Sequence, residues 1–326
     1  MKDLIIAVAA SCGVAAAAAA PAESPIEAPG PAGALRGTLL MPDRVGGPVV
    51  LIIPGSGPTD RDGNSPAGIA ASSYRLLAEG LAAQGVTSVR IDKRGMFGSA
   101  AAIADANAVT LSDYVADIQA WTQVIRERTK ASCVWLLGHS EGGLVAMAAA
   151  KKPDVCGLLL VAAPGRPLGE IIREQLKANP ANAPVLSQAF AALDALEAGK
   201  RFDTANMHPA LLPLFRPQVQ GYLINALSYD PRRLLAGYPK PVLILQGQRD
   251  IQVRETDAQA LKLADPKATL VLLPDVNHVL KSVGSDDRNA NIATYGNPGL
   301  PLAPGIVQSI NDFLTSHAKT GASGNS

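Results

Sequence analysis

The sequence predicts an α/β protein with a mostly parallel sheet flanked by helices. Short apolar runs alternate with helical stretches along most of the 326 residues, and the loops between them are short. Some runs, such as 49–53, are apolar throughout, which is typical of strands buried on both faces of a sheet. Residues 165–238 show no strand pattern and are too long for a loop. We therefore expect a helical cap inserted at that point.

The first residues have the pattern of a secretory signal peptide. An apolar, alanine-rich run is followed by Ala20-Pro21-Ala22, a small-x-small motif that predicts cleavage before Glu23. We therefore expect residues 1–22 to be removed from a periplasmic or secreted protein with no transmembrane span after cleavage. Cys12 leaves lipidation open as an alternative, although Ala9-Ala-Ser-Cys12 lacks the usual leucine.

The domain that follows is expected over residues 35–318. Residues 23–34 are rich in proline, glycine and alanine and are expected to form a linker. The small, polar residues 319–326 are expected to be disordered. Each expected strand is an apolar run that ends at a turn signal. The expected strands are residues 35–40, 49–53, 87–91, 133–137, 156–162, 242–245 and 269–273.

The expected helices have apolar residues at a helical period. The first begins at Ser72 or Ser73 and ends at Gly85, and the second begins at Ser112. Two helices of the cap and two helices near the carboxyl end follow at 168–178, 186–198, 255–264 and 306–314.

Gly138-His139-Ser140-Glu141-Gly142 lies between a predicted strand and an alanine-rich helical run. A Gly-x-Ser-x-Gly sequence in a strand–turn–helix context indicates a nucleophile elbow. The strained turn would lift the serine side chain clear of the sheet, and Gly138 and Gly142 would avoid collisions with the neighbouring strand and helix. We predict Ser140 as the nucleophile, against the alternative of a structural turn serine.

A serine nucleophile needs a base, and the sequence has four histidines. His139 is inside the elbow, where its side chain must point away from that of the serine, while His208 lies in the cap and His317 in the final helix. His278 follows the last predicted strand, so position and elimination both select it as the base.

The base needs an orienting acid. Asp250 follows the strand at 242–245 and gives the chain order Ser, Asp, His. Asp275 is the alternative, but it stands three residues before His278 and is badly placed to turn back onto it. For the oxyanion hole we expect the backbone N–H groups of Glu141 and Ser56, the latter in a glycine loop that could also be an ordinary tight turn.

These motifs resemble the α/β-hydrolase superfamily and, more narrowly, a bacterial serine esterase group that is serine-aminopeptidase-like. The resemblance runs from about residue 35 to 314 and is carried by four segments. They are Gly55-Ser-Gly-Pro-Thr-Asp-Arg-Asp-Gly-Asn64, Asp92-Lys-Arg-Gly95, Gly138-His-Ser-Glu-Gly-Gly143 and Asn277-His278. The sequence departs from the group at Phe97, where many members have glycine. The resemblance implies an α/β-hydrolase fold with a catalytic triad.

The polar loop residues Asp60, Arg61, Asp62 and Asn64 allow two interpretations. They could frame the acyl side of the site, or they could bond to one another and fix the loop, which we favour. Arg94 could anchor the same loop. The side chain of Glu141 is also ambiguous. It suits the N-terminus of a helix, but it could receive a substrate ammonium group.

Cys133 and Cys156 each begin a predicted strand. If these strands are parallel neighbours, both cysteines lie at the end of the sheet opposite Ser140, and an exported location permits a disulfide. Two buried thiols are the alternative to this bridge.

The net charge of +1 gives no indication of a nucleic-acid partner, and the absence of a ligand-spaced His or Cys cluster implies no metal or cofactor. We expect an exported serine carboxylesterase that cleaves short to medium acyl esters, its partner being a small-molecule ester. The alternatives are an aminopeptidase-like peptidase and a non-catalytic envelope-binding protein on the same scaffold.

Overall fold

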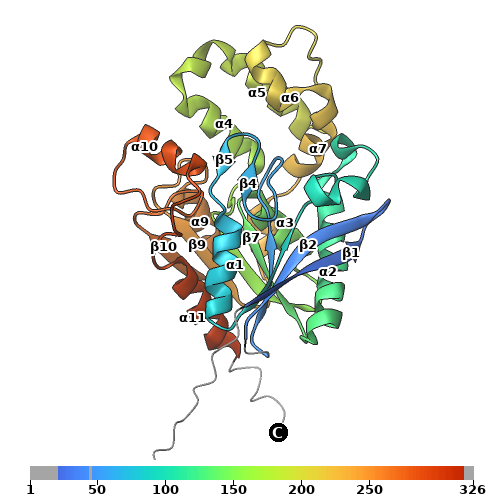
Figure 1. Cartoon of the computed structure of the whole chain (residues 1–326). Helices are drawn as coiled ribbons and strands as arrows, with labels where there is room; N and C mark the ends of the chain where they lie inside the picture. The colour runs from blue at the N-terminus through green and yellow to red at the C-terminus, as the bar shows by residue number, and fades with distance from the viewer. Residues whose placement is uncertain (1–20, 44–45, 319–326) are drawn as a thin grey trace, which may run out of the picture.

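An eight-stranded sheet forms the centre of the fold, in the order β1-β2-β6-β3-β7-β8-β9-β10 (Figure 1). From β6 to β10 neighbouring strands are parallel, whereas β2 is antiparallel to β1 and to β6. The strands are β1 (Ala22–Pro29), β2 (Ala34–Met41), β3 (Val49–Ile53), β6 (Thr87–Ile91), β7 (Val134–His139), β8 (Val155–Val161), β9 (Val242–Gly247) and β10 (Thr269–Leu273). A short hairpin, β4 (Asn64–Ser65) and β5 (Ile69–Ala70), stands apart from the sheet.

This computed structural model describes residues 21–43 and 46–318. Residues 1–20 of the expected signal peptide and the expected tail at 319–326 lie outside the described residues. Among the helices in the described part of the chain, none is both long and apolar enough to cross a membrane.

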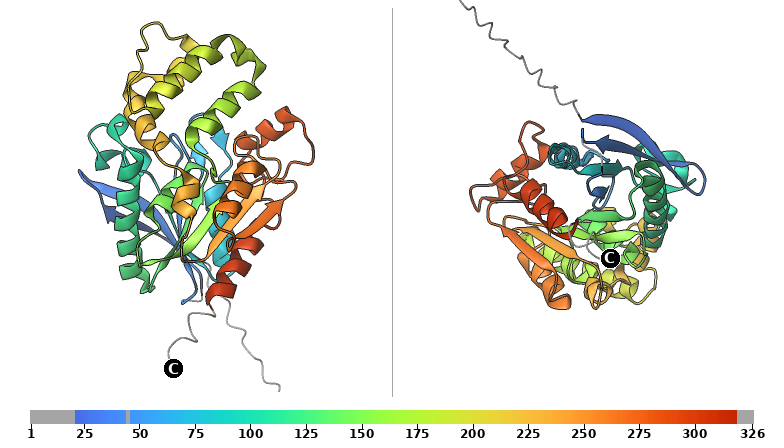
Figure 2. Two further views of the ribbon diagram at one scale, coloured as in Figure 1. Left: turned by 180° about the vertical axis from the view of Figure 1, so that it is seen from behind. Right: turned by 90° about the horizontal axis from the view of Figure 1, so that it is seen from below.

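Helices cover both faces of the sheet (Figure 2). On one face, α1 (Ser73–Ala83) and α11 (Ile306–Ala318) pack around buried side chains such as Leu77 and Ile310. On the other face, α2 (Leu111–Thr129), α3 (Glu141–Ala149) and α9 (Glu255–Ala264) bury a second set that includes Trp121 and Leu261. Burial on both faces explains the continuous apolar runs of the central strands. The predicted α/β fold is thereby confirmed.

The predicted cap is present between β8 and β9, and Figure 1 shows it standing beyond one end of the sheet. It has a hydrophobic core of its own, which includes Leu193, Leu196 and Phe215. Its helices are α4 (Leu168–Ala178), α5 (Leu186–Glu197), α6 (Leu212–Phe215), α7 (Pro217–Leu227) and α8 (Pro231–Leu235). After β10, the short helix α10 (Arg288–Ala293) precedes the final helix.

The expectation of a linker over 23–34 was wrong, because most of this segment forms strand β1 at the edge of the sheet. Ile26 and Ala28 are buried there. Pro25 and Pro29 are four residues apart in β1, so their ring nitrogens face the same side of the strand. An edge strand tolerates proline when the missing N–H groups would face its open side. The proline content that indicated a linker is therefore compatible with an edge strand.

A disulfide joins Cys133 and Cys156, whose Cα atoms are 5.1 Å apart. Cys133 directly precedes β7 and Cys156 is the second residue of β8, which is parallel to β7. The bridge therefore lies at the amino-terminal ends of these strands, as the sequence predicts, and Ser140 follows the carboxyl end of β7.

Candidate active site

Ser140 stands alone between β7 and α3 in a strained backbone conformation. Its φ and ψ are 53° and −127°, a region that non-glycine residues rarely adopt. The chain passes from strand to helix within this one residue, so the serine side chain projects from the end of the sheet and precedes the first helical N–H groups. This is the geometry that the Gly-x-Ser-x-Gly motif predicts.

The two glycines of the motif are required by close backbone contacts. A Cβ atom on Gly138 would lie 2.2 Å from the carbonyl oxygen of Gly142. A Cβ atom on Gly142 would lie 2.3 Å from the carbonyl oxygen of Ile53 on the neighbouring strand. No side chain fits at such distances, so the turn can be this tight only with glycine at both positions.

His278 and Asp250 form a buried pair after β10 and β9. The distance between Nδ1 of His278 and Oδ2 of Asp250 is 2.7 Å, and the two residues are 5% and 3% exposed. The other carboxylate oxygen of Asp250 accepts the N–H groups of Gln252 and Val253. Asp275, the alternative acid, has a side chain that is 64% exposed and lies near Arg249.

The turn that carries His278 is held by the side chain of Asn277. Its amide donates to Asn291 Oδ1 at 3.1 Å and to Thr294 Oγ1 at 2.7 Å, while its oxygen accepts the N–H of Lys281 at 3.0 Å. These bonds fix the orientation of the loop with respect to α10 and the turn after it.

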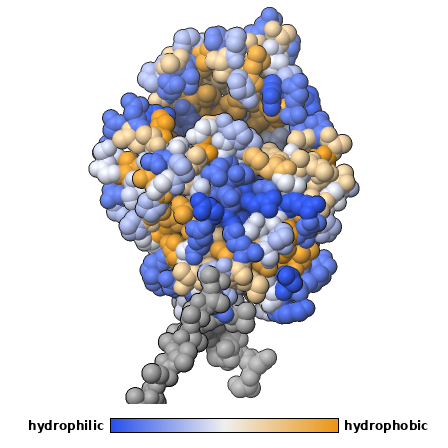
Figure 3. All heavy atoms as spheres, viewed as in Figure 1, coloured by the Kyte–Doolittle hydropathy of each residue, from blue (hydrophilic) through white to orange (hydrophobic). Residues whose placement is uncertain are grey.

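Two cavities meet at Ser140. The smaller, about 60 Å³, is also lined by His278. The larger, about 320 Å³, extends beneath the cap, where Figure 3 shows a hollow with apolar walls. Ser56 and Glu141, the expected oxyanion residues, line the larger cavity together with the serine. Its aliphatic walls come mainly from the cap and from α3, and they include Leu144, Leu168, Ile171, Ile172, Leu214, Val219, Leu223 and Ala226.

His139 makes two buried hydrogen bonds that the sequence did not indicate. Its Nδ1 accepts a hydrogen bond from Tyr74 Oη at 2.8 Å, and its Nε2 donates to the carbonyl oxygen of His278 at 2.8 Å. Burial is the main reason why the pKa of His139 falls to about 3, and the neighbouring His278 lowers it further. His139 is therefore a neutral ring that supports the loop of the predicted base.

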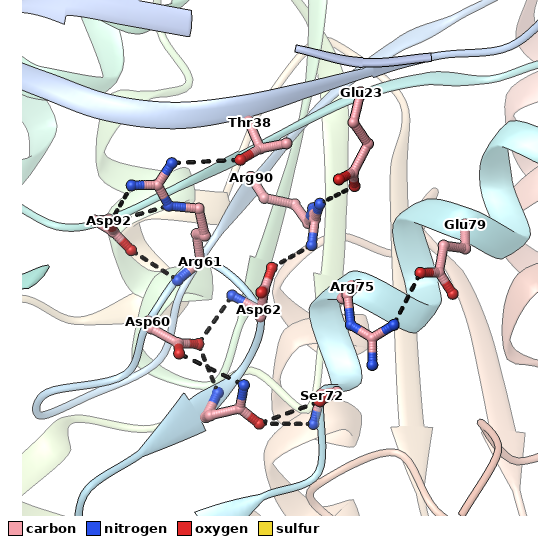
Figure 4. Close-up of polar contacts among 11 residues, drawn as sticks. Glu23, Thr38, Asp60, Arg61, Asp62, Ser72, Arg75, Glu79, Arg90 and Asp92 are labelled. Carbon is pink, nitrogen blue, oxygen red and sulfur yellow. Dashed lines mark hydrogen bonds and ion pairs between the residues drawn. The ribbon is translucent and has the colours of Figure 1, made fainter. Parts of the chain in front are cut away.

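The polar loop after β3 is bonded both to itself and to β6 (Figure 4). Asp60 Oδ1 accepts the N–H groups of Asp62 and Asn64, which closes the turn. Arg61 donates to both carboxylate oxygens of Asp92, just after β6. The Asp60–Asn64 segment is therefore fixed by its own side chains, in agreement with the interpretation favoured from the sequence.

The arginine that anchors this loop from the sheet is Arg90. It lies on β6, is 2% exposed, and pairs with Asp62 on one side and with Glu23 of β1 on the other. The prediction that Arg94 anchors the loop was wrong. Arg94 instead bonds to Asp113 and Asp117 on α2, because it follows the end of the strand, where the chain turns toward that helix.

The carboxylate of Glu141 has a buried cationic neighbour. Its Oε1 lies 3.6 Å from Nζ of Lys93, and the two side chains are 10% and 4% exposed. Burial is the main effect on Lys93 and lowers the pKa of its ammonium group, whereas Glu141 acts to raise it. The Asp-Lys-Arg-Gly motif thus supplies a partner for the carboxylate that could have received a substrate ammonium group.

Phe97, the departure from the family pattern, has a φ of 45°. Glycine adopts this left-handed conformation without cost, while other residues lose about 1–2 kcal/mol. The phenylalanine is 41% exposed and therefore recovers little by burial. In the part of the chain that the structure describes, no group of three or more His, Cys, Asp or Glu side chains is arranged to hold a metal ion.

The fold and the elbow are those of an α/β hydrolase, and the sequence agrees. Residues 49–290 match the alpha/beta hydrolase family, and because this span is well over half of the chain, the protein belongs to that family. Esterase EstD from Thermotoga maritima is 28% identical over 240 residues, which are 72% of this chain and 55% of that protein. The chain thus spans about half the length of this relative.

Two solved structures illustrate the shared fold. Est1E from Butyrivibrio proteoclasticus has a TM-score of 0.56 at 19% identity, over 90% of this chain and 99% of that one. The Pyrococcus furiosus esterase Pf2001 has a TM-score of 0.58 at 14% identity, over 91% of each chain. At these identities the similarity establishes the fold.

Proposed function

We propose that the protein is a serine carboxylesterase with Ser140, His278 and Asp250 as its catalytic triad. The observation that carries this proposal is the position of Ser140. It occupies a strained elbow where an apolar cavity meets a smaller one lined by a buried His–Asp pair. The name of the curated relative, Esterase EstD, supports the same reaction class.

In the proposed reaction Ser140 Oγ attacks the ester carbonyl carbon while its proton passes to Nε2 of His278. The N–H groups of Ser56 and Glu141 donate to the resulting oxyanion. The carbon–oxygen bond to the alcohol breaks, and His278 returns the proton to the leaving alkoxide. Water then gives a proton to the same imidazole and attacks the acyl-enzyme. The bond from the acyl carbon to Ser140 Oγ breaks, His278 returns the proton to this oxygen, and the acid is released. Asp250 holds the ring and stabilises its charged form.

The larger cavity supports an apolar acyl or alcohol group. Its volume of about 320 Å³ and its aliphatic walls fit a short to medium chain, whose burial contributes about 0.8 kcal/mol per methylene. A charged group would lose its hydration there, and Glu141, the charged side chain in the lining, is already paired with Lys93.

The contact of Lys93 with Glu141 favours an ester over an aminoacyl substrate. A peptidase that cleaves at a free amino terminus needs a carboxylate to receive the substrate ammonium group. Glu141 lies at the cavity, but an ammonium group 3.6 Å away already balances its charge. A second cation would therefore meet repulsion from Lys93.

The experiment compares p-nitrophenyl butyrate with aminoacyl anilides on the wild type, on Ser140→Ala and on Ser132→Ala. Ser132 is an exposed serine at the opposite end of β7 and provides the matched control. We expect butyrate hydrolysis and fluorophosphonate labelling in the wild type and the control, with both lost in Ser140→Ala. Turnover of the anilides with little ester hydrolysis, or labelling that survives Ser140→Ala, would contradict the proposal.

We further propose that the protein is exported and carries out this reaction in the periplasm or outside the cell. The bridge between Cys133 and Cys156 supports export, since disulfides persist mainly in oxidising compartments. Fractionation of the native host, followed by amino-terminal sequencing, tests this. We expect a chain that begins at Glu23 and is absent from the cytosol, and a cytosolic protein with its first residues intact would contradict export.

A further inference from the structure

Gly55 is held at both of its backbone polar atoms by buried side chains. Its N–H donates to Tyr74 Oη at 3.0 Å, and its carbonyl oxygen accepts from Lys93 Nζ at 2.6 Å. Tyr74 is 2% exposed and Lys93 is 5% exposed. Gly55 is itself buried, so both polar atoms need partners within the protein, and here two side chains supply them and fix the peptide.

The contact with Lys93 determines the direction of the next N–H group. The carbonyl of Gly55 and the N–H of Ser56 belong to one planar trans peptide, in which they point in opposite directions. When Lys93 holds the carbonyl on one side, the N–H of Ser56 is held on the other. A cationic donor at the carbonyl also polarises the peptide and makes its N–H a stronger donor.

Lys93 lies close to both proposed oxyanion donors. It donates to the Gly55 carbonyl, which shares a peptide with the Ser56 N–H, the first donor. It also contacts the side chain of Glu141, and the backbone N–H of Glu141 is the second donor. Its ammonium group also lies 5.2 Å from the centre of the Tyr114 ring, which helps to stabilise a buried cation.

Tyr74 extends the support of Gly55 to the base. The N–H of Gly55 can only donate and the carbonyl of His278 can only accept, so the bonds between them run in one direction. Gly55 N–H donates to Tyr74 Oη, Tyr74 O–H donates to His139 Nδ1, and His139 Nε2–H donates to the His278 carbonyl. This chain fixes the tautomer of His139 and links the glycine loop to the loop of the base.

We propose that Lys93 and Tyr74 are positioning residues for the oxyanion hole. Together they hold the Gly55 peptide so that the Ser56 N–H faces the charge that develops on the substrate oxygen. The inference rests on the proposed esterase function, and it assigns a role to two side chains that do not touch the reacting atoms.

The test measures kcat and KM of Lys93→Met and Tyr74→Phe with p-nitrophenyl butyrate. Because the oxyanion forms only in the transition state, we expect kcat to fall about 10- to 100-fold while KM stays within about threefold. The affinity for a trifluoromethyl ketone, which forms a tetrahedral adduct with the serine, should fall in parallel with kcat. Wild-type kcat in both variants, or a loss confined to KM, would overturn the proposal.

A double variant separates positioning from charge balance. If Lys93 served only to neutralise Glu141, then Lys93→Met with Glu141→Gln would recover the kcat of Glu141→Gln alone. We expect the double variant to remain at least about tenfold slower than Glu141→Gln, because the Gly55 carbonyl is still unheld. Full recovery would overturn the role assigned to Lys93.

Lys240→Met is the matched control for the loss of a lysine that donates to loop carbonyls. Lys240 bonds to the carbonyl oxygens of Lys152 and Pro153 near the start of β8, at the opposite end of the sheet from Ser140. We expect its kcat to stay within about twofold of the wild type, and an equal loss there would overturn the proposal.

Near-UV circular dichroism identifies a variant that fails to fold, and if Lys93→Met does not fold, Tyr74→Phe decides by the same kcat criterion. Failure of the proposed function has a different signature. In that case the wild type itself would show no ester hydrolysis that depends on Ser140, whatever the two variants do.

Discussion

Oδ2 of Asp250 lies 2.7 Å from Nδ1 of His278, and Asp250 is almost completely buried. The second oxygen of Asp250 is occupied by the N–H groups of Gln252 and Val253, so the carboxylate cannot rotate away from the ring. The carboxylate accepts the proton on Nδ1, which leaves Nε2 as the basic nitrogen. In the proposed mechanism this tautomer is the one that can take the proton of Ser140.

Asp250→Asn should remove this preference for the tautomer while conserving the volume of the side chain. We expect kcat for p-nitrophenyl butyrate to fall by about 10³- to 10⁴-fold. Asp275→Asn is the matched control, because Asp275 is the largely exposed acid on the loop that carries His278. A larger loss in Asp275→Asn than in Asp250→Asn would contradict the proposed triad.

The sequence was sufficient to predict which candidate site residues lie at the carboxyl edge of the parallel sheet. Ser140, Asp250 and His278 each follow a strand of a parallel sheet, and the carboxyl ends of parallel strands share one edge, so an apolar run followed by a polar residue indicates the position. The roles of Lys93 and Tyr74 could not be predicted in this way. Their contacts depend on side-chain direction across distant segments, which hydrophobic periodicity does not encode.

Two predictions were wrong, the linker over residues 23–34 and the anchoring role of Arg94, and both failed because they depend on tertiary structure. Prolines indicate a break in regular structure, yet β1 tolerates them because it lies at an edge, and the position of a strand in a sheet is not a local property. Arg90 and Arg94 have the same side chain and are only four residues apart. Only the direction of the chain at the end of β6 determines which of them faces the polar loop.

Gly142→Ala should damage the elbow without changing any polar group. The added methyl would lie 2.3 Å from the Ile53 carbonyl oxygen and 2.7 Å from that of Pro54, so the backbone must move. We expect a loss of about 2–4 kcal/mol in the free energy of unfolding in urea and a kcat at least tenfold lower. Gly284→Ala is the control, since a Cβ there meets nothing within 4 Å, and equal losses in both variants would refute the steric argument.

His139 should make stability depend on pH in the acid range. Its pKa is about 3 in the folded protein and about 6.5 when unfolded, so the unfolded chain binds one more proton between these values. Its contribution is fully present above pH 6.5 and is lost as the pH falls, by about 1.4 kcal/mol per unit down to about pH 3.

Urea unfolding at pH 7 and pH 4.5 measures this contribution as the difference between the wild type and His139→Gln. The wild type should lose about 2–3 kcal/mol more than the variant on acidification. His208→Gln, at an exposed histidine of the cap, is the control and should keep the wild-type dependence. A variant that loses as much stability as the wild type would show that His139 is not held neutral.

Removal of the disulfide should affect stability and spare catalysis. The bridge closes a loop with a sequence separation of 23, for which chain entropy gives about 3 kcal/mol of stabilisation. The double variant with serine at Cys133 and Cys156 should therefore unfold at lower urea, while kcat stays within about twofold because the bridge is at the far end of β7. Wild-type stability in the double variant would contradict this.

Val219→Phe should shorten the acyl chain that the larger cavity accepts. Val219 lies on α7 and lines this cavity together with Ser140, so a phenyl ring there occupies space beneath the cap. An acyl chain that loses contact with the cavity wall over two methylenes loses about 1.6 kcal/mol of burial free energy. We therefore expect kcat/KM for p-nitrophenyl octanoate to fall more than tenfold. The acetate ester, which does not reach that wall, should keep its rate. Gln218→Phe, at the exposed neighbouring position, adds the same ring outside the cavity and should change neither rate. If Val219→Phe slowed acetate and octanoate equally, the chain would not extend beneath the cap.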